Sequence, residues 1–190
     1  MKRFLLFSFS FLYSVFLWAR SGENPAADTT KKRSYFELSF GSSLIFVSYD
    51  KSVKIRNSAD IVIPSSAMLF FAEMRPAKKI RFPVFFNLPT ESKQYVVNGQ
   101  LVYVKASPTF GAGVQFNLFH AKLSSRTALE MELGAMGSCL FTGTGALRLA
   151  PIAAGRLRAI RDNDFVMYMG SSYSIGINAW GIFYGTGFFF

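Results

Sequence analysis

The chain contains little charge, one cysteine and one histidine. Asp, Glu, Lys and Arg make up 17% of its 190 residues, against about a quarter in typical soluble domains. A single cysteine, Cys139, excludes an intrachain disulfide. A single histidine, His120, argues against a zinc-type site, which takes several His or Cys ligands. We therefore expect no metal ion and no cofactor.

Long hydrophobic runs are missing beyond the N-terminus, although 51% of the residues are hydrophobic and 17% are aromatic. The one such run, 4–19, follows Lys2 and Arg3 and ends near the small residue Ser21. This order is typical of a secretory signal peptide, which we place at residues 1–21. An uncleaved membrane anchor is the alternative, but the run is at or below the lower length limit for a spanning helix.

The segment 22–33 is polar, and we expect it to be a flexible periplasmic lead-in to a domain at 34–190. From Gly22 onward the chain has 18 Lys and Arg against 11 Asp and Glu, a net charge of +7. A basic charge raises nucleic acid as a partner, but no basic helix or nucleic-acid motif is present in this secreted chain. Anionic lipid headgroups suit the charge better.

After residue 33, apolar and polar residues alternate in short stretches. Eight stretches are about long enough for a tilted strand to cross a bilayer: 34–47, 67–75, 80–88, 107–119, 125–137, 144–159, 164–174 and 178–190. If the N-terminus is periplasmic, the two longest connections, 48–66 and 89–106, both lie outside the cell. Short periplasmic turns and longer external loops are typical of outer-membrane barrels. The sequence predicts an all-β fold, an eight-stranded antiparallel up-and-down transmembrane β-barrel.

One face of the predicted strands is free of charge. We take every second residue, beginning in each stretch at Phe36, Met68, Ile80, Phe110, Thr127, Leu147, Phe165 and Trp180. Those 41 positions hold no charged residue, whereas about seven would be expected at 17%. A Lys or Arg facing lipid at the bilayer centre costs ~2–4 kcal/mol, so we assign this face to the membrane.

The last stretch alternates aromatic and apolar residues back from a terminal Phe. It resembles the C-terminal β-signal of bacterial outer-membrane barrels, which the barrel-assembly machinery recognises. The resemblance implies that Ile182, Tyr184, Phe188 and Phe190 form an assembly signal, with Thr186 as a departure from the usual apolar residue. In size and loop asymmetry the chain from residue 22 looks like the OmpX and OmpA transmembrane-domain class.

The opposite face collects Arg and Glu but no Lys. We expect an interior ion-pair network of Glu37, Glu73, Arg75, Arg81, Arg126, Glu130, Glu132, Arg148, Arg156 and Arg158. An eight-stranded barrel is only wide enough for side chains to fill it, so interior charges need partners. Arg suits this role because its planar guanidinium forms bidentate pairs with carboxylates.

Three functional interpretations remain open. Some eight-stranded barrels modify lipid A with a His, a Ser and an acidic residue at the outer rim, but His120 lacks that Ser and lies beside a predicted periplasmic turn. A narrow pore is the second, against which the Arg-filled interior argues. We favour a monomeric, non-enzymatic protein with a structural, adhesive or surface-protective role, embedded among outer-membrane lipids and lipopolysaccharide. Its external ligand is not evident, although alternation over 96–104 suggests a protruding sheet edge suited to strand addition.

Overall fold

The computed structural model describes residues 36–47, 49–50, 55–56, 62–77, 79–97, 99–141, 147–162, 164–175 and 178–190. The predicted signal peptide and lead-in lie outside the described residues. No helix in the described ranges is long and apolar enough to cross a membrane.

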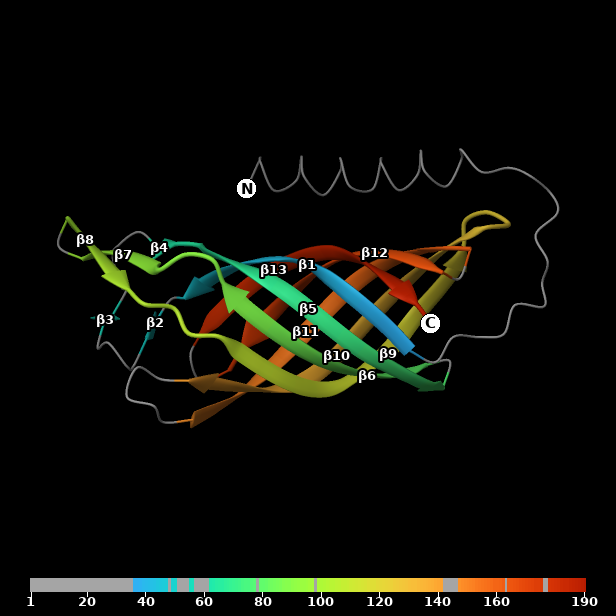
Figure 1. Ribbon diagram of the computed structural model, residues 1–190, viewed down its shortest axis with the longest axis horizontal. Helices are drawn as coiled ribbons and strands as arrows, with labels where there is room; N and C mark the ends of the chain where they lie inside the picture. The colour runs from blue at the N-terminus through green and yellow to red at the C-terminus, as the bar shows by residue number, and fades with distance from the viewer. Residues whose placement is uncertain are drawn as a thin grey trace.

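Eight antiparallel strands form one closed barrel (Figure 1). They are β1 (Phe36–Val47), β5 (Ser65–Ala77), β6 (Ile80–Pro89), β9 (Thr109–Lys122), β10 (Thr127–Phe141), β11 (Leu147–Arg161), β12 (Phe165–Ser174) and β13 (Ala179–Phe189). Each follows its sequence neighbour around the wall, and β13 pairs with β1 to close it. All eight predicted strands are confirmed, with ends shifted by a few residues; β10, for example, extends past the predicted residue 137.

Five short strands lie beyond the barrel, at the end away from the C-terminus (Figure 1). They are β2 (Tyr49–Asp50), β3 (Ile55–Arg56), β4 (Val62–Ile63), β7 (Lys93–Val97) and β8 (Gln100–Val104). Strands β7 and β8 form a hairpin closed by Val97 and Gln100, and Gly99 in its turn has a φ of 75°, which favours glycine. Strand β4 adds to the other side of β7, so the sheet order is β4–β7–β8.

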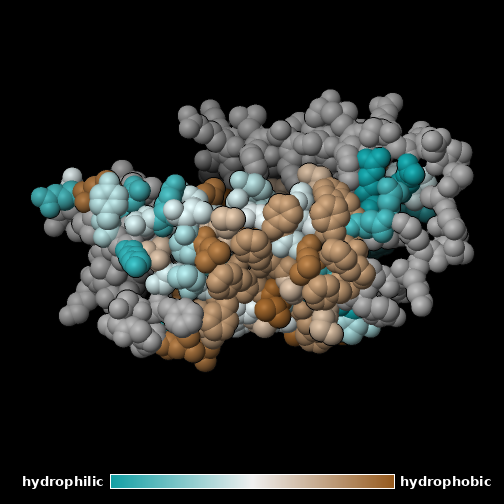
Figure 2. Space-filling view, in the orientation of Figure 1, coloured by the Kyte–Doolittle hydropathy of each residue, from teal (hydrophilic) through white to brown (hydrophobic). Residues whose placement is uncertain are grey.

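The outside of the barrel is an apolar belt with hydrophilic side chains toward its two ends (Figure 2). Exposed side chains on it include Phe40, Val84 and Leu149. Of the 41 positions predicted to face lipid, Thr127 alone is buried, with 2% exposure. The prediction was wrong there: Thr127 lies at the β9–β10 turn, where the regular strand begins and its carbonyl accepts hydrogen bonds from the N–H groups of Leu123 and Ser124.

The interior is filled in three layers along the barrel axis. An aromatic cluster that includes Phe71, Phe85, Tyr168 and Phe183 occupies the half nearer the external strands. Ile160, Val166 and Phe189 form a smaller cluster at the opposite end, where β1 begins and β13 ends and which the sequence predicts to face the periplasm. Buried Arg and Glu side chains lie between the two clusters. Such a lumen is packed like a protein core and places the ionic layer between two apolar clusters.

Candidate functional site

Glu132 on β10 is the centre of the ionic layer. The β10–β11 hairpin places Glu130 opposite Arg158 and Glu132 opposite Arg156. The Glu132 carboxylate accepts hydrogen bonds from Nε of Arg156 at 2.5 Å and from Nη1 of Arg158 at 2.9 Å. It also forms an ion pair with Arg81 of β6. Three guanidinium groups therefore share one fully buried carboxylate.

The two β11 arginines also reach across the lumen to the opposite wall. Arg156 donates Nη1 and Nη2 to the two carboxylate oxygens of Glu73 on β5, each at 2.5 Å. Arg158 donates to the Glu37 carboxylate on β1. Glu37 and Glu73 are direct neighbours in the β1–β5 register. Like charges side by side are unfavourable in a sheet, and here each carboxylate has its own arginine.

Glu130 forms the edge of the network nearer the periplasm. It pairs with Arg81, lies 3.6 Å from Arg158 Nη1 and lies 4.0 Å from Arg75 Nη2. With these contacts the network joins four arginines to four glutamates, so the formal charges of its members cancel. The members are Glu37, Glu73, Arg75, Arg81, Glu130, Glu132, Arg156 and Arg158.

Aromatic rings cover the network from both sides. The guanidinium carbon of Arg75 lies 4.5 Å from the centroid of the Phe189 ring, and that of Arg158 lies 5.7 Å from it. On the other side Arg156 lies 5.6 Å from the Phe71 ring and 5.9 Å from the Tyr168 ring. These are cation–π distances, which favour charged guanidinium groups in a poorly hydrated space.

Two of the ten predicted network residues lie elsewhere. Arg126 is placed just before β10, where its Nε lies 3.2 Å from Asp162 of the neighbouring periplasmic turn. Arg148 aligns with Leu140 near the external end of the barrel, eight residues along β11 from Arg156. That separation is roughly 26 Å of strand, too far for a shared pair. The prediction was too broad because alternation reports which face a residue occupies but not its height in the lumen.

The sequence did not place His120 in the network, yet its Nδ1 lies 3.3 Å from Glu130 Oε1. The cause is a β-bulge in β9, where Met131 aligns with Phe119 and Glu132 aligns with Asn117. One residue is inserted there, so the alternation of β9 reverses and His120 comes to stand opposite Glu130. The His120 side chain is 58% exposed and marks the periplasmic mouth of the network.

Residues for catalysis are not assembled around His120 in the described part of the chain. His120 contacts Glu130, which also pairs with arginines. Ser124 in the adjacent turn accepts hydrogen bonds from the N–H groups of Arg126 and Thr127. Across the described ranges, no group of three His, Cys, Asp or Glu side chains is arranged to hold a metal ion. The glutamates are thus ion-pair partners in this structure.

The C-terminal strand divides its aromatic residues between the two faces of the wall. Tyr184, Phe188 and Phe190 point outward and are exposed, whereas Phe183 and Phe189 are buried in the lumen. The N–H of Phe190 donates to the carbonyl of Phe36, so the terminus is fixed to β1. Gly185 stands opposite Tyr168, and a Cβ at this position would collide with the Tyr168 hydroxyl.

A closed eight-stranded barrel with a charge-free outer belt and a filled lumen defines a small integral outer-membrane β-barrel protein. No protein-family profile and no curated protein matches the chain. Among solved structures it is similar to the outer membrane protein OprG of Pseudomonas aeruginosa, with 13% identity, a TM-score of 0.49, and coverage of 84% of this chain and 97% of that chain.

Two further barrels show a similar degree of likeness. For the N-terminal β-barrel domain of OprF from Pseudomonas aeruginosa, identity is 8% and the TM-score is 0.47, over 84% of this chain and 98% of that chain. For Ail, the attachment invasion locus protein of Yersinia pestis, identity is 12% and the TM-score is 0.47, over 84% of this chain and all of that chain (100%). At such identities the likeness concerns the fold alone.

Proposed function

We propose that this barrel is a non-enzymatic membrane anchor with an adhesive role, which presents the β4–β7–β8 sheet to an extended segment of an external polypeptide. The observation that carries the proposal is the open edge of β8, which has β7 as its one neighbour among the described strands. A strand with a free edge binds peptides by main-chain hydrogen bonds, and pockets or side chains of alternate residues give specificity.

The filled lumen favours a membrane anchor and argues against a pore. The network of Arg and Glu and the aromatic cluster at Phe71 and Tyr168 follow each other along the axis, and both are buried. An eight-stranded wall leaves no room beside such layers for an aqueous channel. The external strands are therefore the part of the protein that is free to meet a partner.

The register of the hairpin identifies which groups point to the open edge. In a two-residue hairpin the closing pair, here Val97 and Gln100, exchanges hydrogen bonds, and the next pair does not. Leu101 and Tyr103 therefore direct their N–H and C=O groups away from β7. Their side chains, 46% and 63% exposed, lie on one face of the sheet and offer apolar contact to an added strand.

The edge is tested by removing one N–H group from it. We expect Leu101→Pro to abolish binding, since proline has no N–H to donate and Leu101 does not use its own toward β7. Leu101→Thr changes the side chain but keeps the donor, and is the matched control. Phage-displayed short peptides, selected on cells carrying the wild-type protein, would be measured against both variants.

The proposal predicts peptides that bind wild-type cells, keep most of that binding on Leu101→Thr cells and lose it on Leu101→Pro cells. Equal binding to the proline variant, with equal amounts of folded barrel on both cells, would show that the edge of β8 is not the binding surface.

A further inference from the structure

Outward-facing side chains on β1, β5 and β6 form three rows that run across the strands. The middle row is Leu38, Ala72 and Val84, which the strand register aligns. The row on its external side consists of Phe40, Phe70 and Phe86. The row on its periplasmic side consists of Phe36, Met74 and Phe82. Smaller side chains thus lie between two ridges of larger ones.

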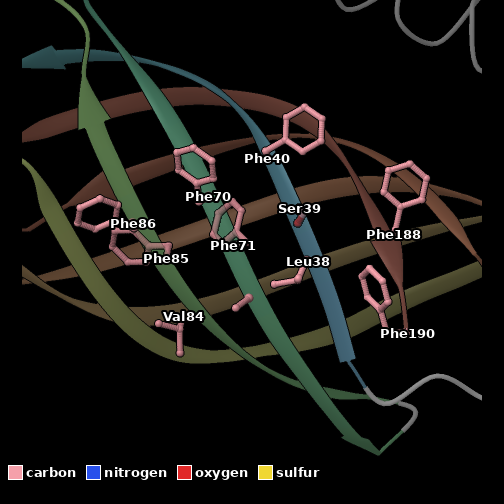
Figure 3. A pocket seen from close by; sticks show the side chains of 11 residues that line it. Leu38, Ser39, Phe40, Phe70, Phe71, Val84, Phe85, Phe86, Phe188 and Phe190 are labelled. Carbon is pink, nitrogen blue, oxygen red and sulfur yellow. The ribbon is translucent and has the colours of Figure 1, made fainter.

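A groove of 410 Å³ lies along the middle row and against the row on its external side; the three residues of the periplasmic row do not line it. Ala72 and Val84 lie along it, and Phe188 and Phe190 of the C-terminal strand stand at one end (Figure 3). Phe40 and Phe70 rise on its external side. Its volume is within the ~300–1,000 Å³ typical of small-molecule sites, and rigid aromatic rings form much of its wall.

The groove lies on the surface that faces the membrane, so lipid is the molecule that covers it. All of its outward-facing lining residues belong to the charge-free belt, so hydrocarbon lies against it in the membrane. The C-terminal end of the groove is at the periplasmic end of β13. Among the described charged side chains at this end of the barrel, Lys79 is exposed in the turn that joins β5 to β6, the two strands that carry Ala72 and Val84. Others lie at the β9–β10 turn (Lys122, Arg126) and the β11–β12 turn (Arg161, Asp162, Asp164).

We propose that this groove holds one acyl chain of an anionic phospholipid from the periplasmic leaflet. The chain enters between Phe188 and Phe190 and lies along Ala72 and Val84, where the smaller side chains leave space. Each methylene that moves from general lipid contact to this preformed site gains close packing against fixed rings. Lys79, in the turn of the two strands that carry the groove, favours a negative headgroup over a neutral one.

Native mass spectrometry of the refolded mature barrel with phosphatidylglycerol tests the proposal, with lipopolysaccharide in a competing arm. Ala72→Phe places a ring in the groove from outside and leaves the lumen untouched. Ala135→Phe is the matched control, because Ala135 is exposed on the belt but aligns with Ala153 and Val114, away from the groove.

We expect one phosphatidylglycerol per chain on the wild type and on Ala135→Phe. Binding to Ala72→Phe should be about tenfold weaker, the effect of losing roughly two buried methylene groups. If Ala72→Phe does not give a folded barrel, Val84→Phe fills the same groove and carries the same expectation.

Three results would overturn the proposal. Equal phosphatidylglycerol binding by the groove-filled variant would mean that the lipid is not held at this position. Preferential retention of lipopolysaccharide would contradict the periplasmic leaflet as the source. A lipid-free dimer that Ala72→Phe dissociates would show that the groove is an interface between two copies.

Discussion

Replacing Glu132 by glutamine is expected to lower the free energy of unfolding of the barrel by about 3–5 kcal/mol, because it leaves buried guanidinium charges without their carboxylate. Arg81, Arg156 and Arg158 all contact this one side chain. Glutamine keeps nearly the same volume, so the loss reports charge and hydrogen bonding and not a cavity. Denaturant unfolding of the refolded barrel measures this loss.

The matched control is Glu91→Gln, since Glu91 is an exposed residue between β6 and β7. Surface changes of this kind usually stay within about 0.5 kcal/mol. Equal and small effects of the two substitutions would show that the ionic layer is hydrated and not enclosed.

A double-mutant cycle on Glu73 and Arg156 tests the direct contact across the lumen. The two residues form the bidentate pair that joins β5 to β11. When one member has already been replaced, replacing the other should lower the free energy of unfolding by a smaller amount. The double variant should therefore lose less stability than the two single variants summed. Strict additivity would contradict the contact. The large loss of stability is expected when one partner of a buried pair is removed. Replacing a whole buried ion-pair network by apolar residues is often neutral.

Deleting Phe188 to Phe190 is expected to reduce the amount of folded barrel in cells to a small fraction of wild type, while export to the periplasm continues. The deletion removes the residues that align with Glu37 and Leu38 of β1, and the hydrogen bond from Phe190 to Phe36. We propose that it also removes part of the signal for the barrel-assembly machinery. Folded and unfolded protein are separated by gel mobility without heating.

Single substitutions separate recognition from packing. Phe189 contacts the lumen arginines, so Phe189→Ala should lower stability in refolded protein as well as in cells. Phe188 and Phe190 point outward, and Phe188→Ala with Phe190→Ala should reduce yield in cells but leave refolding in detergent nearly unchanged. If the deletion left the yield of folded barrel in cells unchanged, both the recognition role of Phe188 and Phe190 and the packing role of Phe189 would be contradicted.

Strand number and the lipid-facing side could be predicted because a half-buried strand repeats every two residues. The same repeat put Glu130 and Glu132 on the face of Arg156 and Arg158, and the hairpin between their strands then brought them together. Alternation predicts the register of adjacent strands well, since a one-residue slip would turn the apolar set into the lumen and the charged set toward lipid.

Features that depend on a break in alternation could not be predicted this way. His120 reaches Glu130 only because of the bulge in β9, and the buried Thr127 lies at the β9–β10 turn, where the regular alternation of β10 begins. The strands β2, β3 and β4 have two residues each, too short for a periodic pattern. The heights of Arg126 and Arg148 depend on the stagger of the closed barrel, which a single strand does not encode.

The described strands form a closed barrel, and we expect the protein to reside in the outer membrane. Electrophoresis of separated membranes from the native host, with and without boiling, tests this expectation most directly. We predict that the protein is found in the outer-membrane fraction and that unheated samples migrate differently from boiled ones, since a closed barrel resists unfolding by detergent. A protein that is soluble in the periplasm, or that stays with the inner membrane, would contradict the account.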